Sequence, residues 1–146
     1  MNDEIFRGLI HAALVTNKNS FKEGEDLKED LKDKDFTQED FSPSAIAFLK
    51  SYVSSFVAAF PRFCECPDPY RTYQWNPNEG TLWDYIGHDL WLNTCGHGSG
   101  FWDGDWEEVI GKKLSAWCDN QGDIDIYLGD DGLIYVSGEE KYGETE

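Results

Sequence analysis

The residues best suited to chemistry lie close together in the stretch GHDLWLNTCGHGSGFWDGDW, which covers residues 87–106. It contains two of the three histidines of the chain, His88 and His97, together with Cys95 and Asp103. Imidazole, thiolate and carboxylate groups bind zinc and serve as general acids and bases. Two interpretations follow: a metal or hydrolytic site built from His88, His97 and Asp103, or a structural turn that carries the same residues.

The expected local structure argues against a shared metal site. The aromatic-rich segment predicts a hairpin over about 88–103, with its glycines in a compact turn. A strand advances about 3.3 Å per residue, so His88 would lie roughly 20 Å from a turn that contains His97. Asp103 would pair near the middle of the first strand, away from His97. We therefore expect no cofactor and no enzymatic activity, aromatic rings that pack in the core, and His97 as a contact residue or brace at the loop tip.

Three segments have the apolar periodicity of helices: about 3–16, about 43–60 and about 105–118. Ser42 and Pro43 provide an N-cap and a suitable first residue for the second helix. Asp103 or Asp105 can cap the third helix. His11 lies in the first helix and is expected to be a structural or surface residue.

A second hairpin is predicted over 123–137, because apolar and polar residues alternate before the turn signal Asp131-Gly132 and an apolar run follows it. Thr81 and Asp84 indicate a short capped helical turn before the first hairpin. Together these elements predict an α+β fold, with an antiparallel sheet of two hairpins, about 88–103 and 123–137, flanked by the three helices.

The length of 146 residues fits one domain. We expect this domain to cover residues 1–138, with an acidic insert at 22–40 and a frayed acidic tail at 139–146. The four cysteines form no C-x-x-C pair, and neither a secretion signal nor a membrane span is found, so a cytoplasmic protein is expected.

The net charge of −17 is concentrated in two parts of the chain. Residues 22–40 contribute −5 and residues 84–146 contribute −12. A surface with this charge repels nucleic acid and anionic membranes and attracts basic protein surfaces. The expected partner is therefore the basic surface of another protein, with no direct binding of nucleic acid or membrane.

The stretch at 87–106 and the later GDIDIYLGDDGLIYVSG together resemble a family of small proteins from bacteriophages and related mobile elements. The resemblance covers roughly residues 82–138. The matching positions are Gly87, His88, Asp89, Trp91, Leu92, Gly96, His97, Gly98, Gly100, Phe101, Trp102, Asp103, Tyr127, Gly129, Asp130, Asp131 and Gly132. Cys95 stands where the family has a polar residue, usually asparagine, which argues against Cys95 as a metal ligand or nucleophile. The resemblance implies that host proteins are the targets.

Charge and resemblance together predict an acidic phage-type protein that binds and inhibits a host nucleic-acid-binding enzyme or defence complex, with imitation of nucleic acid as one mode of binding. The residues expected to contact the partner are acidic: Asp103, Asp105, Glu107, Glu108, Asp123, Asp125, Asp130 and Asp131. The alternative is a small metal-binding protein or hydrolase that uses His88, His97 and Asp103. Turn chemistry is the competing explanation for the aspartates of the second hairpin.

Overall fold

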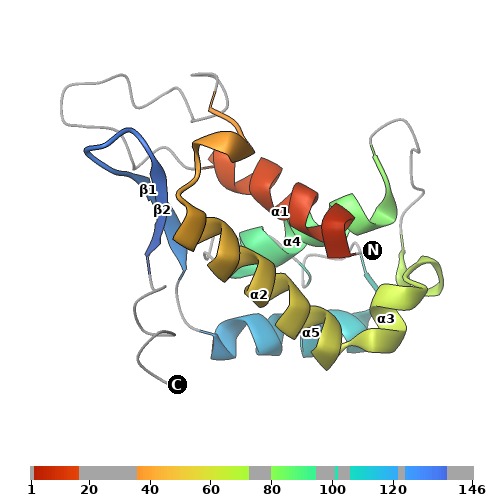
Figure 1. Ribbon diagram of the computed structural model, residues 1–146. Coiled ribbons are helices and arrows are strands. Elements are labelled where there is room, and N and C mark those ends of the chain that lie inside the picture. Colours follow the sequence, from red (N-terminus) through yellow and green to blue (C-terminus); the bar gives the residue numbers. More distant parts are fainter. Residues whose placement is uncertain are drawn as a thin grey trace.

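The computed structural model describes residues 2–16, 36–72, 80–94, 101, 106–121 and 124–137. Asp125 is described by its backbone alone. These residues form an α+β fold that is mostly helical, with one two-stranded antiparallel sheet (Figure 1). The α-helices are α1 (Asn2–Thr16), α2 (Pro43–Ala59), α3 (Pro61–Glu65), α4 (Leu82–Thr94) and α5 (Glu108–Asn120). Two short 3-10 turns, η1 (Gln38–Asp40) and η2 (Asp68–Tyr70), precede α2 and follow α3. The strands are β1 (Asp125–Leu128) and β2 (Ile134–Ser137).

The helix predicted at 43–60 is confirmed as α2. Its start follows from the local sequence, because the Ser42 hydroxyl accepts a hydrogen bond from the Ala45 N–H at 3.1 Å and Pro43 occupies the first turn. Leu49, Val53 and Phe56 follow at helical spacing and are almost fully buried. These side chains form the core face of α2.

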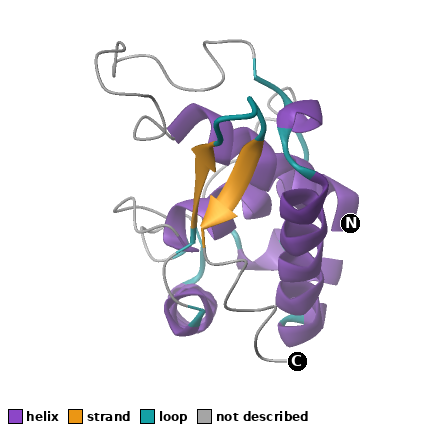
Figure 2. Cartoon of the chain, turned by 60° about the vertical axis from the view of Figure 1, so that its left-hand side comes forward, coloured by secondary structure: helices purple, strands orange, loops and turns teal. Residues whose placement is uncertain are grey.

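The hairpin predicted at 123–137 is also confirmed, with β1 and β2 paired from Asp125–Ser137 to Leu128–Ile134. Ile126 and Val136 are buried on the inner face, where β2 packs against α2. The two strands lie at the left end of the helices in Figure 1 and in front of the helices in Figure 2, where that side comes forward. The chain turns at Gly132, whose backbone φ of 84° is rarely adopted by residues other than glycine.

The hairpin predicted at 88–103 is wrong. Residues 82–94 form the helix α4, and among the described residues the only sheet is the later hairpin. The predicted capped turn is the beginning of this helix: the Asp84 N–H donates to the Thr81 hydroxyl at 3.2 Å, and the Thr81 N–H donates to the Asp84 carboxylate at 2.9 Å. The physical reason for the helix is its spacing of buried residues, since Leu90 follows Ile86 by four positions and Trp91 follows the buried Gly87 by four positions.

The helices α1 and α4 lie side by side in close contact (Figure 1). Their approach depends on two glycines. A Cβ atom on Gly8 would lie 2.0 Å from the Asp84 carbonyl oxygen, and one on Gly87 would lie 2.0 Å from the Ile5 carbonyl oxygen. Only residues without side chains permit backbones to pack this closely. The two glycines therefore fix which faces of the two helices meet.

The helix predicted at 105–118 begins later, at Glu108, and is capped by Glu107 rather than by Asp103 or Asp105. The Glu107 carboxylate accepts hydrogen bonds from the N–H groups of Val109 and Ile110 at 2.8 and 3.1 Å. A carboxylate at this end is stabilised by the helix dipole.

Buried polar groups of α4 tie it to the segment that follows. The Trp106 indole N–H donates to the buried Asp89 carboxylate at 2.7 Å, and the Phe101 N–H donates to the Asn93 side-chain oxygen at 3.2 Å. The prediction that Trp91 and Phe101 belong to the core is confirmed. Trp91 belongs to the helix α4, however, and not to a strand of a hairpin.

Candidate functional site

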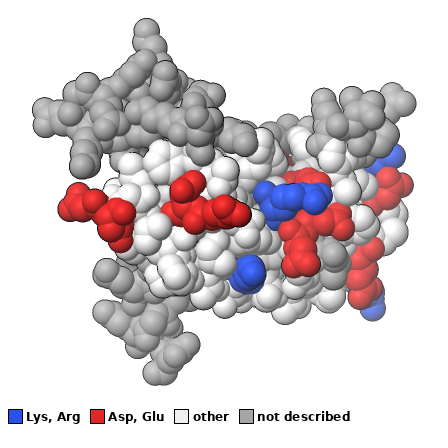
Figure 3. Space-filling model, turned by 45° about the horizontal axis from the view of Figure 1, so that its top comes forward, with Lys and Arg blue, Asp and Glu red and all other residues white. Residues whose placement is uncertain are grey.

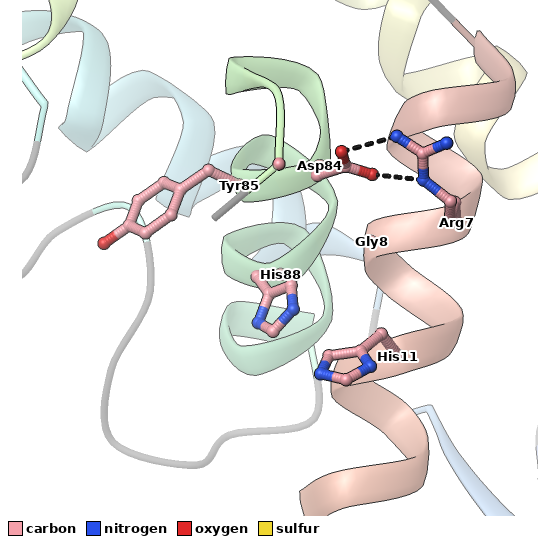
Figure 4. A pocket seen from close by; sticks show the side chains of 7 residues that line it. Arg7, Gly8, His11, Asp84, Tyr85 and His88 are labelled. Atoms are coloured by element: carbon pink, nitrogen blue, oxygen red, sulfur yellow. Dashed lines mark hydrogen bonds and ion pairs between the residues drawn. The ribbon is translucent and has the colours of Figure 1, made fainter. Parts of the chain in front are cut away.

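A pocket of about 550 Å³ lies along the junction of α1 and α4. Residues from both helices and from the turn before α4 line it: Arg7, Gly8, His11, Gly80, Asp84, Tyr85 and His88. The close-up view shows Arg7 and His11 on one helix facing Asp84 and His88 on the other (Figure 4). Arg7 and His11 are four positions apart on α1, and Asp84 and His88 are four positions apart on α4. The two residues of each helix therefore lie on the same face of it. The pocket therefore combines an ion pair with a pair of imidazoles, one helical turn apart.

The ion pair has two parallel hydrogen bonds. Arg7 donates from Nε to Asp84 Oδ1 at 2.7 Å and from Nη2 to Asp84 Oδ2 at 2.6 Å. Burial alone would raise the pKa of the Asp84 carboxyl, but the hydrogen bonds from Arg7 and Thr81 outweigh it and hold the pKa below its usual value. Thr81 also donates to Glu4 at 2.6 Å. This network links the first turn of α4 to α1.

The imidazole rings of His11 and His88 lie with their centres 5.1 Å apart and their planes inclined by 40°. His11 is exposed, whereas His88 is half-buried. Burial lowers the pKa of His88, and the charge that His11 can carry lowers it further, while Asp84 acts in the opposite direction. His88 is therefore held in its neutral form, which can accept a proton or bind a metal ion.

The pocket includes residues that the sequence analysis did not select as functional. The sequence predicts a structural or surface role for His11 and assigns no functional role to Arg7, Asp84 or Tyr85. The signal available in the sequence was the i, i+4 spacing of Arg7 with His11 and of Asp84 with His88. That spacing does not show which two helices face each other.

Of the alternative metal set His88, His97 and Asp103, the structure describes only His88. The separation of roughly 20 Å between His88 and the turn with His97 was based on a strand and does not apply. Residues 88–94 are helical, and a helix rises only about 1.5 Å per residue, so they span about 9 Å. Among the described residues, no three His, Cys, Asp or Glu side chains form a group that could hold a metal ion.

Four of the predicted contact residues have described side chains. Glu108, Asp130 and Asp131 are exposed and Glu107 is partly exposed. Asp131 has a turn role as well, since it accepts hydrogen bonds from the Leu133 N–H at 3.0 Å and from the Tyr135 hydroxyl. The other predicted contact positions lie outside the residues whose side chains are described: Asp103, Asp105, Asp123 and Asp125, together with His97.

Among the described residues, the acidic side chains on the face seen in Figure 3 do not form one continuous patch. Acidic side chains gather in several separate groups along this face, with uncharged surface between some of them and basic side chains beside the groups on the right. Burial raises the pKa of Cys64 and of Cys118 to about 12, so both thiols stay protonated at neutral pH. Cys66 is exposed, and all three of these cysteines are free.

Comparison of the chain with protein-family models, with curated proteins and with solved structures gave no match. In the part of the chain that the structure describes, every helix is too short or too polar to cross a membrane. The class that the structure defines is a small acidic α+β protein, with a pocket between two closely packed helices that is lined by an ion pair and two imidazoles.

Proposed function

We propose that the protein binds a basic surface of another protein through its exposed carboxylates. The observation that carries this proposal is the net charge of −17 together with the exposure of acidic side chains at two places, the start of α5 and the tip of the hairpin. Charge of this size accelerates the encounter with an oppositely charged partner and excludes anionic ones.

Two of the acidic side chains at these places, Glu107 and Asp131, have a pKa below the ordinary value. Hydrogen bonds from the N–H groups of Val109 and Ile110 lower the pKa of Glu107, and the Tyr135 hydroxyl and the Leu133 N–H lower the pKa of Asp131. Both groups also stabilise local structure, as an N-cap and as a turn acceptor. Local hydrogen bonding and partner binding are compatible here, because each carboxylate remains at the surface.

The partner class follows from the sequence resemblance and from the charge. A host nucleic-acid-binding enzyme or defence complex offers a basic cleft shaped for phosphate, and an acidic protein that occupies this cleft would inhibit it. The separate acidic groups in Figure 3 supply negative charge at several points of one face, as a nucleic-acid backbone does.

The test is retention of bacterial nucleic-acid-binding proteins on the immobilised chain, followed by elution with duplex DNA. A charge-reversed variant, Glu108→Lys with Asp130→Lys, should lose at least about tenfold in retention. The matched control is Glu65→Lys with Asp68→Lys, which changes the net charge equally at exposed positions of α3 and η2. Equal losses in both variants, or equal retention at about 0.05 M and 0.5 M salt, would refute a specific electrostatic interface.

A further inference from the structure

We propose that His11 and His88 form a binding site for a divalent transition-metal ion, with zinc as the reference ion. The two imidazoles come from different helices and meet at the pocket between α1 and α4. Imidazole is a common ligand of zinc, copper and nickel, and a metal ion binds its neutral form. This inference concerns a different surface from the proposed partner interface and does not depend on it.

The distance between the rings fits a shared ion. A zinc–nitrogen bond is about 2.0–2.1 Å long and the nitrogen lies about 1.1 Å from the centre of its ring, so two imidazoles on one tetrahedral ion have ring centres about 5 Å apart. The observed separation of His11 and His88 is 5.1 Å. Binding requires that one nitrogen of each ring points to the shared ion, and the planes of the two rings are inclined by 40° rather than parallel.

The surrounding structure holds the two rings at this distance. Gly8 and Gly87, each adjacent in position to the site, bring the backbones of α1 and α4 together. One turn away, the Arg7–Asp84 ion pair fixes how the two helices are aligned along their length. The imidazoles are therefore positioned by the fold before any ion binds, which reduces the entropic cost of binding.

The protonation state also favours binding. Burial lowers the pKa of His88, which favours the neutral ring that a metal ion binds. The strongly negative charge of the chain attracts cations as well.

The site has open coordination positions. Among the described residues no third His, Cys, Asp or Glu completes a group around the pair. The remaining positions of the ion therefore face the pocket of about 550 Å³, where water or a small ligand with an oxygen or nitrogen donor can occupy them. Zinc sites that activate water usually have three protein ligands and one open position, whereas the two described imidazoles would leave two positions of a tetrahedral ion open.

Competing thiol sites are limited in the described part of the chain. Cys64 and Cys118 are buried, and their pKa values of about 12 disfavour the thiolate that a metal needs. Cys66 is exposed, so the zinc titration includes a Cys66→Ser variant that tests whether this thiol binds the ion.

The experiment is calorimetric titration of the metal-free full-length chain with zinc chloride at pH 7.5. The variants are His11→Gln, His88→Gln, His97→Gln and Cys66→Ser, each checked for native helix content by circular dichroism. We expect one zinc per chain, at least about tenfold weaker binding in His11→Gln and in His88→Gln, and a change of less than about threefold in His97→Gln and Cys66→Ser. His97→Gln is the matched control, because it removes an imidazole outside the proposed pair.

The inference is overturned if the unmodified chain binds no zinc, if His11→Gln binds as tightly as the unmodified chain, or if His97→Gln loses as much affinity as His11→Gln. Should His88→Gln fail to fold, His11→Gln decides the matter, since His11 is exposed and its replacement leaves the core intact. Nuclear magnetic resonance gives a second readout: zinc must shift the ring signals of His11 and His88 together, with the same titration midpoint.

Discussion

The substitution Gly87→Ala tests whether the packing of α1 against α4 depends on a missing side chain. Gly87 is buried in the middle of α4, and an added Cβ would meet the backbone of α1 at three points. The distances are 2.0 Å to the Ile5 carbonyl oxygen, 2.6 Å to the Leu9 nitrogen and 3.0 Å to the Gly8 carbonyl carbon. These atoms are backbone, so they cannot rotate away as a flexible side chain would.

The expected magnitude follows from two opposing effects. Alanine is a better helix former than glycine, which stabilises α4 by about 1 kcal/mol. Overpacking of a well-packed core costs about 1–3 kcal/mol and occasionally more, and a backbone clash lies at the upper end of this range because the whole helix has to move. The net loss should be about 2 kcal/mol or more, which for a chain of this size corresponds to roughly 4–8 °C in Tm.

The assay is urea unfolding followed by tryptophan fluorescence, with thermal melting as a second measurement. Ala116→Gly is the control, because residue 116 is an exposed position of α5 and reports helix propensity without a packing change. It should lose about 1 kcal/mol. If Gly87→Ala is as stable as the unmodified protein, or more stable, the close contact between the two helices is not a property of the folded chain.

Three further predictions concern the pH response, the thiols and the ion pair. The free energy of unfolding should decrease as the pH falls below 6.5, the ordinary pKa of histidine, because the pKa of His88 is lowered in the folded chain and the unfolded chain therefore binds a proton first. In urea titrations from pH 7 to 5, His88→Gln should make the free energy of unfolding depend less steeply on pH. An unchanged pH dependence would contradict this cause. Iodoacetamide should label Cys66 in the native protein well before Cys64 and Cys118, as peptide mapping by mass spectrometry can check, and equal labelling would contradict their burial. Arg7→Lys should cost less than about 1 kcal/mol in urea unfolding, since 63% of the Arg7 side chain is exposed, and a loss above about 2 kcal/mol would show a larger structural role.

The parts of the fold that the sequence predicted correctly are those with strong local signals. Ser42 and Pro43 mark the start of α2, and the Asp131-Gly132 turn marks the hairpin. In each case a few neighbouring residues determine the backbone conformation through hydrogen bonds or restricted φ angles. Such signals do not depend on distant contacts, which is why they can be recognised in a single sequence.

The error at α4 has a specific cause. Aromatic and apolar residues between Trp83 and Trp91 suit a strand by type, and the glycine at position 87 weakens a helix. The spacing of Ile86, Leu90 and Trp91 nevertheless fits a helix, and the Thr81–Asp84 cap begins it. Periodicity over several turns was the better signal here than residue type, because Gly87 is required by the contact with α1 and not by the local conformation.

The pairing of His11 with His88 could not be predicted, because it depends on which two helices pack together. The contact between Arg7 and Asp84 spans 77 residues, and no local pattern encodes it. Once the contact exists, the helical repeat determines the rest: an ion pair at positions 7 and 84 places positions 11 and 88 together one turn later. Gly87→Ala should therefore weaken zinc binding as well as stability, because the residue that permits the close approach of the helices precedes the histidine that depends on it. A Gly87→Ala variant that loses stability but binds zinc as tightly as the unmodified chain would show that the ion does not need the packed pair.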